Sequence, residues 1–156
     1  MKTRCRISGL DGLKVTLAKV KEGVASPEIL EKAAAGLKER ILERTALGRD
    51  VDGEAFAPYS PRYAKRRARA GKDAKLVTLR SSGAMLDSIT TQARQTEVSL
   101  GFNPSKEALK ASRLQAAGVG DKRIKRRFFV VSEDDRAWVV RTVAGGVKEK
   151  IKEALK

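Results

Sequence analysis

The stretch of sequence that decides the fold begins with GRDVDGEAFAPYSP (residues 48–61) and continues with RYAKRRARAGK (62–72). After a short apolar piece it ends with LRSSGAMLDSI (79–89). Acidic residues and glycine favour a turn, and a serine followed by proline marks the start of a helix. These segments therefore predict a polar loop, a basic helix, a short strand at residues 76–79 and the capped start of another helix.

The polar loop begins like a calcium-binding EF-hand loop, because Asp50, Asp52 and Gly53 have the matching order. The later ligand positions and the closing glutamate are missing. Aspartate and glycine are also common in turns, because the Asp side chain bonds the nearby backbone and glycine tolerates a positive φ. We therefore predict a turn and no metal site, and we expect Phe56 and Tyr59 to fold this loop onto the core.

Two runs of the chain are strongly basic. The first is a predicted helix over residues 62–70, opened by Ser60-Pro61 and closed by Gly71, and its basic residues are Arg62, Lys65, Arg66, Arg67, Arg69 and Lys72. The second precedes an apolar segment and contains Lys122, Arg123, Lys125, Arg126 and Arg127. Neither run has an apolar face broad enough to explain it by folding. We therefore predict that these eleven residues face DNA or an acidic protein.

Apolar spacing predicts long amphipathic helices towards both ends of the chain. After a possible strand at residues 3–8, the apolar residues of segment 10–23 recur every three or four positions and predict a helix. A second helix begins at Ser26-Pro27 and continues to about residue 45. The last helix covers residues 133–156, with acids at its start and lysines at its end. Gly145-Gly146 predicts a kink or a break in it.

The middle of the chain contains the predicted sheet. Residues 90–93 and 96–101 alternate weakly between apolar and polar, which indicates two antiparallel strands with a turn at residues 94–95. A helix is expected from residue 104 to about 117, and residues 128–131 resemble a strand. Together these elements predict an α+β fold, with a small antiparallel sheet packed by several helices in a single domain over residues 1–156. The basic loop and helix at about 49–75 are an insertion in this domain.

Composition limits what the protein can do. The chain has 156 residues and a net charge of +15, from 34 Lys and Arg against 19 Asp and Glu, which favours polyanionic partners. It contains no histidine, so chemistry that needs an imidazole is excluded. A lone Cys5 cannot form an internal disulfide. With no apolar run long enough to span a bilayer and no signal-like segment, we expect a soluble protein made in the cytoplasm, with no membrane partner.

Few residues suit catalysis. The remaining acidic candidates are Asp50 and Asp52 in the loop and the cluster Glu133, Asp134 and Asp135, which helix capping already explains. A nuclease that holds Mg²⁺ with carboxylates is the sharpest enzymatic alternative, because a basic surface suits it, but no further acid has suitable spacing. We therefore expect neither an enzyme nor a cofactor.

The order of these segments resembles the virion morphogenesis, or tail-completion, proteins of tailed bacteriophages. The resemblance rests on the acidic-glycine loop with its aromatic, Pro and Ser, on the basic helix, and on LRSSGAMLDSI (79–89). It extends to LQAAG (114–118), RFFVVS (127–132) and Asp134-Asp135. The chain departs from that pattern at Leu114, where the family often has histidine, and it lacks the usual prolines before the Arg-aromatic segment.

The resemblance implies a structural protein of the virion, assembled in the host cytoplasm. It implies tail completion or head–tail joining at the neck, as a ring of copies, expected to be six-fold, around the channel through which DNA leaves. Its implied partners are other copies of itself, the tail tube and the head-connector proteins, with possible non-specific contact to DNA. The alternative interpretation of the charge is a sequence-independent nucleic-acid-binding protein.

Overall fold

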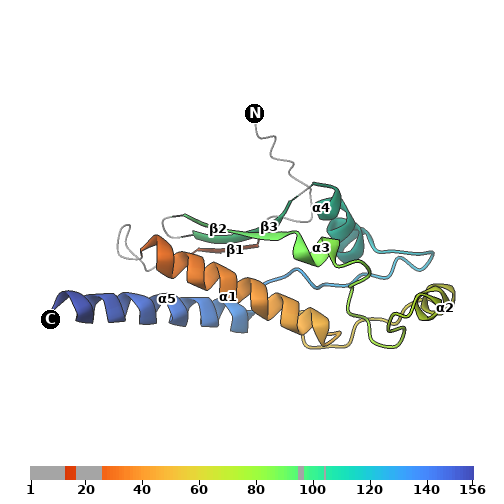
Figure 1. Ribbon diagram of the computed structural model, residues 1–156, viewed down its shortest axis with the longest axis horizontal. Helices are drawn as coiled ribbons and strands as arrows, with labels where there is room; N and C mark the ends of the chain where they lie inside the picture. The colour runs from red at the N-terminus through yellow and green to blue at the C-terminus, as the bar shows by residue number, and fades with distance from the viewer. Residues whose placement is uncertain (1–12, 17–25, 95–96, 104) are drawn as a thin grey trace.

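The computed structural model of the chain describes residues 13–16, 26–94, 97–103 and 105–156. Its fold is α+β, with a small antiparallel sheet packed by helices, as predicted. Figure 1 shows three layers, in which a long helix lies between the sheet and the C-terminal helix. The predicted strand at residues 3–8 lies outside the described residues.

The sheet has three antiparallel strands in the order β1-β3-β2. The predicted hairpin is confirmed as β2 (Ile89–Arg94) and β3 (Glu97–Phe102), with Ile89 opposite Phe102. The prediction of a helix over residues 10–23 is wrong for residues 13–16, which form β1 (Leu13–Thr16) on the other edge of β3. The sequence LKVT also alternates apolar with polar, and pairing with β3 decides between the two patterns. The rest of that predicted helix lies outside the described residues.

Helix α1 (Pro27–Ala46) is the central element of the molecule. It contacts β2 and β3 on one side and the last helix on the other. Its apolar positions recur at helical spacing, so its buried apolar residues are Ile29, Leu30, Ala33, Ala34, Leu37 and Ile41. The predicted start at Ser26-Pro27 is confirmed, although the Ser26 hydroxyl makes no capping hydrogen bond. Proline at the first helical position supplies the start signal instead.

Helix α5 (Glu133–Ala154) runs antiparallel to α1 along its outer side (Figure 1). Ser132 and Asp135 form a capping box at its start, as the serine and the acids predict. The predicted kink or break at Gly145-Gly146 is wrong, because the helix is continuous there and Figure 1 shows it straight. Gly146 lies against Ile29 of α1, and an added Cβ would lie 2.9 Å from Ile29 Cγ2. The close approach of the two helices therefore explains this glycine.

Two predicted strands are absent from the described part of the chain. Residues 128–131 form no strand, and the Gln115 side chain bonds their backbone instead: it accepts a bond from Phe129 N (2.8 Å) and donates one to Phe129 O (2.9 Å). Phe128 and Phe129 nevertheless belong to the core, packed against Phe102. Residues 76–79 are irregular because Leu79 has a φ of +56°, although Val77 is buried.

Short helices complete the fold at one end of the sheet. They are α3 (Ala84–Asp87) and α4 (Ser105–Ser112), and a π-helical turn at Arg113–Ala117 continues α4. Gly118, with a φ of +79°, then ends this helical segment, as predicted. None of the described helices is long and apolar enough to cross a bilayer.

Candidate interaction surface

The polar loop after α1 is ordered by its own side chains. One oxygen of Asp50 accepts hydrogen bonds from the backbone N–H groups of Asp52 (2.9 Å) and Glu54 (3.0 Å). This is the turn geometry that the sequence predicts. Phe56 is buried and Tyr59 packs against the core, so the prediction that these residues fold the loop back is confirmed. The loop thus leads the chain to a defined position for the basic helix.

The predicted basic helix is confirmed as α2 (Pro61–Arg69), which lies at the opposite end of the molecule from the C-terminus (Figure 1). The Ser60 hydroxyl accepts a bond from Tyr63 N, and Gly71, with a φ of +65°, follows the helix. Arg67 is buried and donates to the backbone oxygens of Asp73 (2.7 Å) and Arg80 (3.1 Å). Arg67 therefore attaches α2 to the segment that follows it.

The second basic run contains a matching buried arginine. Arg126 donates to the backbone oxygens of Ala57 (2.9 Å) and Pro58 (3.2 Å). Burial lowers the pKa of its guanidinium by more than the nearby Tyr59 and Tyr63 raise it, so the pKa lies below its ordinary value. The expectation that neither run serves folding is therefore wrong for Arg67 and Arg126, because each is buried and bonds the backbone of another segment.

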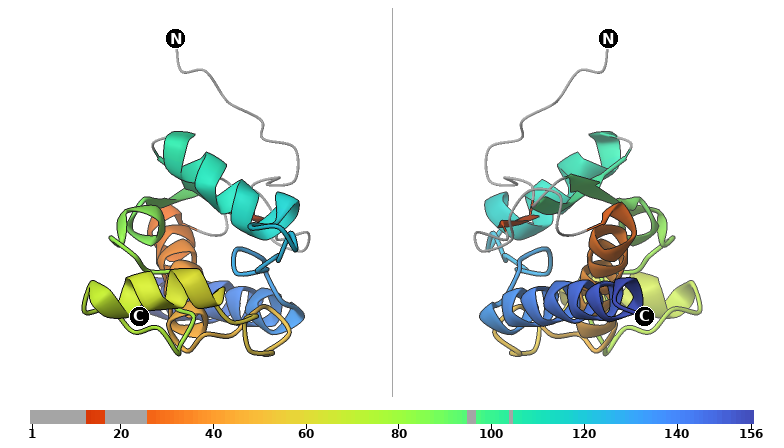
Figure 2. Two further views of the ribbon diagram at one scale, coloured as in Figure 1. Left: turned by 90° about the vertical axis from the view of Figure 1, so that its right-hand side faces the viewer. Right: turned by 90° about the vertical axis from the view of Figure 1, so that its left-hand side faces the viewer.

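Both buried arginines contact the same aromatic ring. The guanidinium carbons of Arg67 and Arg126 lie 4.8 and 5.7 Å from the ring centroid of Tyr59. Cation–π attraction acts at this distance. Two runs that are far apart in the sequence are thus brought together around one tyrosine, at the end of the molecule where Figure 2 shows α2 and the segment 118–127.

The remaining cations of the two runs differ in what they contact. Lys72 donates to the backbone oxygen of Ser81 (2.6 Å), and Arg127 forms an ion pair with Asp52 (2.7 Å). The guanidinium of Arg66 lies 4.8 Å from the Tyr63 ring centroid. Apart from Lys72, seven side chains of the runs are exposed with no ion-pair partner in the part of the chain that the structure describes, and we call them the basic end: Arg62, Lys65, Arg66, Arg69, Lys122, Arg123 and Lys125.

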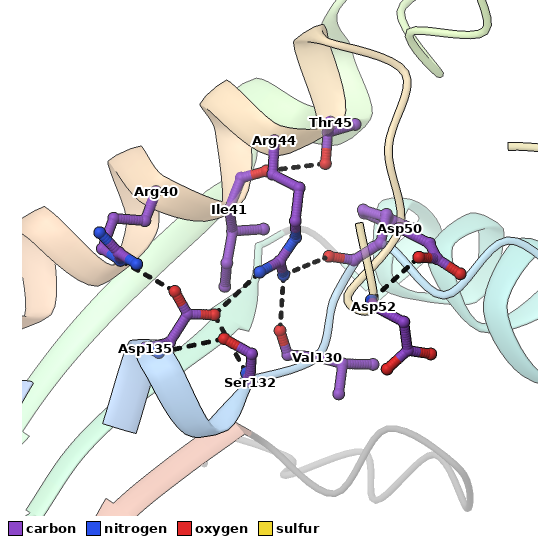
Figure 3. A network of polar contacts seen from close by, with 10 residues as sticks. Arg40, Ile41, Arg44, Thr45, Asp50, Asp52, Val130, Ser132 and Asp135 are labelled. Atoms are coloured by element: carbon purple, nitrogen blue, oxygen red, sulfur yellow. Dashed lines mark hydrogen bonds and ion pairs between the residues drawn. The ribbon is translucent and has the colours of Figure 1, made fainter. Parts of the chain in front are cut away.

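A polar network that the sequence analysis did not find joins α1 to α5 (Figure 3). Asp135 is 1% exposed and receives bonds of 2.9 Å from Arg40 and from Arg44. Arg44 also donates to the backbone oxygen of Val130 (2.8 Å). The signal in the sequence is the spacing of Arg40 and Arg44, which places both on one face of α1.

The acidic residues singled out as catalytic candidates include three that make structural contacts: Asp50, Asp52 and Asp135. Burial raises the pKa of the Asp135 carboxyl, but bonds from Ser132, Arg44 and Arg40 together lower it further, so that the pKa lies below its ordinary value. Asp50 orders its loop and Asp52 pairs with Arg127. Among the described residues, no three His, Cys, Asp or Glu side chains gather in a group that could hold a metal ion.

Comparison with known families decides the kind of protein. A model of the phage virion morphogenesis family matches residues 10–109 of the chain. The chain belongs to the phage virion morphogenesis family. No curated protein and no solved structure matches it. The match includes the whole sheet, α1 and α2, and it ends within α4, so the second basic run and α5 lie outside it.

Membership in the phage virion morphogenesis family gives the chain its general role. This is a family of structural and assembly proteins, so the chain has a structural or morphogenetic role in a phage and is associated with the virion. The family resemblance of the sequence is thereby confirmed. Since the first basic run lies inside the matched region and the second outside it, the basic end combines a family segment with a segment beyond the match.

Proposed function

We propose that this virion morphogenesis protein completes the tail and joins it to the head, as a ring of copies at the neck whose basic end faces the DNA channel. The observation that carries the proposal is the convergence of the two basic runs on Tyr59. Tertiary contacts bring the seven exposed cations of the basic end to one end of the folded molecule. A ring of several copies would repeat this charge around the channel.

The basic end suits contact with phosphates rather than with bases. Its cations are long side chains on a short helix and on a loop, which meet phosphate oxygens as charges without reading sequence. Such binding is weak at physiological salt and falls steeply as salt rises. DNA that passes through a channel needs this kind of contact, because a tight or sequence-specific grip would stop its passage.

The DNA-facing role is tested by the salt dependence of duplex binding. Replacing Arg62, Lys65 and Arg66 by Gln should weaken binding and reduce the slope of log K against log salt by up to about three, roughly one for each lost phosphate contact. Arg67 and Arg126 stay unchanged, because their loss would disturb the fold. The matched control replaces Lys32, Lys152 and Lys156 by Gln, three exposed cations far from α2.

Each outcome of this experiment decides the role of the basic end. We call the protein with Gln at positions 62, 65 and 66 the α2 variant. A DNA-facing surface is supported if the α2 variant binds DNA more weakly than the parent protein while the control variant binds as the parent does. Equal slopes for all three proteins would overturn it. Normal DNA binding by the α2 variant together with failure to join tails to heads would show that the basic end docks on an acidic protein instead.

Ring formation has its own measurement. Light scattering should give a mass above that of one chain, either for the protein alone at high concentration or after tail tubes are added. A strict monomer under both conditions would contradict the ring. If the protein bound DNA but never joined a particle, the alternative of a nucleic-acid-binding protein outside the virion would be favoured.

A further inference from the structure

Helix α5 has a second apolar face that the fold leaves uncovered. Its first face lies against α1 and contains the buried residues Asp135, Val139 and Val143, together with Gly146, which lies against Ile29. Other apolar residues of α5 follow one another at alternating spacings of three and four, and we call them the α5 seam: Ala137, Val140, Ala144, Val147, Ile151 and Ala154. Val140 is 50% exposed and Ile151 is 53% exposed.

This spacing is that of a helix that packs along another helix. Apolar residues at alternating intervals of three and four form the a and d positions of a heptad pattern, which buries them against a partner helix. Leu155, 83% exposed, extends the apolar surface beside the last turn. Val147 is half-buried and packs against the core, so the seam adjoins the contact with α1 and continues it outward.

The charges beside the stretch of the seam from Val140 to Ile151 have one sign. Side chains three or four positions away are neighbours on a helix surface. For the stretch from Val140 to Ile151, the charged neighbours are all cations: Arg136, Arg141, Lys148 and Lys150. Arg136 pairs with Glu133 and Lys150 with Glu28, whereas Arg141 and Lys148 have no ion-pair partner among the described residues. The acids Glu149 and Glu153 lie on other faces of the helix.

These charges disfavour a second copy as the occupant of the seam. In an antiparallel pair of α5 helices that matches Val140 with Ile151, Arg141 would lie beside Lys148 of the other copy. A parallel pair would place cations beside cations as well. Like charges at such positions oppose association, while acidic flanks on the partner would favour it.

We propose that the α5 seam binds an amphipathic helix of another protein, with apolar residues in a heptad pattern and acidic residues on both flanks. Such a contact lies at a distance from the basic end, which stays free to meet DNA. The inference goes beyond the proposed function and does not depend on it, since a helix on α5 could connect the protein to any neighbour in the particle.

The test uses the full chain and a synthetic probe. The probe is a three-heptad helical peptide with Leu and Ile at the a and d positions and Glu at the flanking positions, and its binding is followed by fluorescence anisotropy. A matched peptide carries Lys in place of each Glu. The Glu peptide should bind at least about tenfold more tightly than the Lys peptide, a difference of about 1.4 kcal/mol.

Variants of the seam sharpen the test. Val140→Gln with Ile151→Gln should weaken binding of the Glu peptide by at least about tenfold, while Leu109→Gln, at an apolar position of α4 that is 46% exposed, should leave it unchanged. Arg141→Glu with Lys148→Glu should reverse the preference in favour of the Lys peptide. This reversal shows that the charges choose the partner and does not depend on a change in stability.

Three results would overturn the proposal. Equal binding of the two peptides would show that the flanking charges do not select the partner. Unchanged binding in the Val140 and Ile151 variant would show that the peptide lies elsewhere. Light scattering gives the third result: if the parent protein has the mass of several chains and the Val140 and Ile151 variant has the mass of one, a second copy covers the seam.

Discussion

Arginine has two roles in this chain: buried arginines bond backbone oxygens, and exposed arginines form the basic end. Arg67 and Arg126 are each 5% exposed, and their guanidinium groups donate to backbone oxygens of other segments. Arg44 does the same for Val130 while it also pairs with Asp135. A planar group with several N–H donors can bond more than one oxygen, which lysine cannot do with the same geometry. Arg67 and Arg126 are therefore buried and Arg44 is partly buried, although arginine is a strongly polar residue type.

At the residue scale, Asp135→Asn should destabilise the protein by about 3 kcal/mol. The amide keeps the size of the side chain and leaves the partly buried Arg44 guanidinium without its charge partner. Urea unfolding measures this loss. Glu133→Gln is the control, because that residue is exposed and its pair with Arg136 is at the surface, where ion pairs contribute about 0–1 kcal/mol. Equal stabilities for the two variants would contradict the role of Asp135.

The same carboxylate predicts a pH dependence. Because the pKa of Asp135 is lowered in the folded protein, its contribution is fully present above the unfolded pKa of about 3.9 and is lost as the pH falls through the lower folded value. The stability difference between the parent and Asp135→Asn should thus be constant near neutral pH and shrink below about pH 4. A difference that stays constant down to pH 2 would show that Asp135 does not titrate in this way.

At the scale of elements, the contact between α1 and α5 depends on glycines that give the helices room. An added Cβ at Gly36 would overlap Cη2 of Trp138, whose ring also receives the Arg40 guanidinium at 5.6 Å. At Gly146 the added carbon would meet Ile29. At Gly145 it would meet no atom within 4 Å. The adjacent glycines of α5 therefore differ: Gly146 makes room for α1, and Gly145 does not.

These contacts predict opposite effects of the same substitution. Gly145→Ala should stabilise the protein by about 0.5–1 kcal/mol, because alanine favours the helix. Gly36→Ala should gain the same preference but lose about 1–3 kcal/mol through the forced movement of the Trp138 ring. Thermal unfolding should therefore show a higher midpoint for the first variant and a lower one for the second. Two raised midpoints would mean that α1 and α5 do not pack this closely.

At the scale of the whole molecule, α1 connects the sheet to the outer helix. Leu37 and Ile41 are fully buried between these layers. In the part of the chain that the structure describes, no other long helix covers the sheet or α5. The stability of the domain therefore depends on the hydrophobic contacts on both sides of α1.

Replacing Leu37 or Ile41 by Ala should each cost about 2–5 kcal/mol, because a cavity forms in the centre of the molecule. Leu47→Ala is the matched control, since Leu47 is 66% exposed just after the same helix and should change stability by less than about 0.5 kcal/mol. The measurement is urea unfolding followed by circular dichroism. Similar losses for Leu37→Ala and Leu47→Ala would place the core elsewhere.

Several features follow from the sequence alone because their causes are local. Proline after Ser26 starts α1, the pair Ser132 and Asp135 caps α5, and short alternating segments form the hairpin of β2 and β3. The turn at Asp50 is equally local, since its carboxylate bonds the backbone of the next residues. The positions of most helices and the α+β class could therefore be predicted.

Other features depend on segments far apart in the chain, and only the tertiary structure decides them. Residues 13–16 form a strand because β3 offers a free edge, while residues 128–131 form none because Gln115 bonds the backbone of Phe129. Gly146 lets α5 pack closely against Ile29, although glycine weakens an isolated helix. Arg67 and Arg126 look like surface charge in the sequence. Their place around Tyr59 follows from contacts between distant segments, which residue type and spacing do not encode.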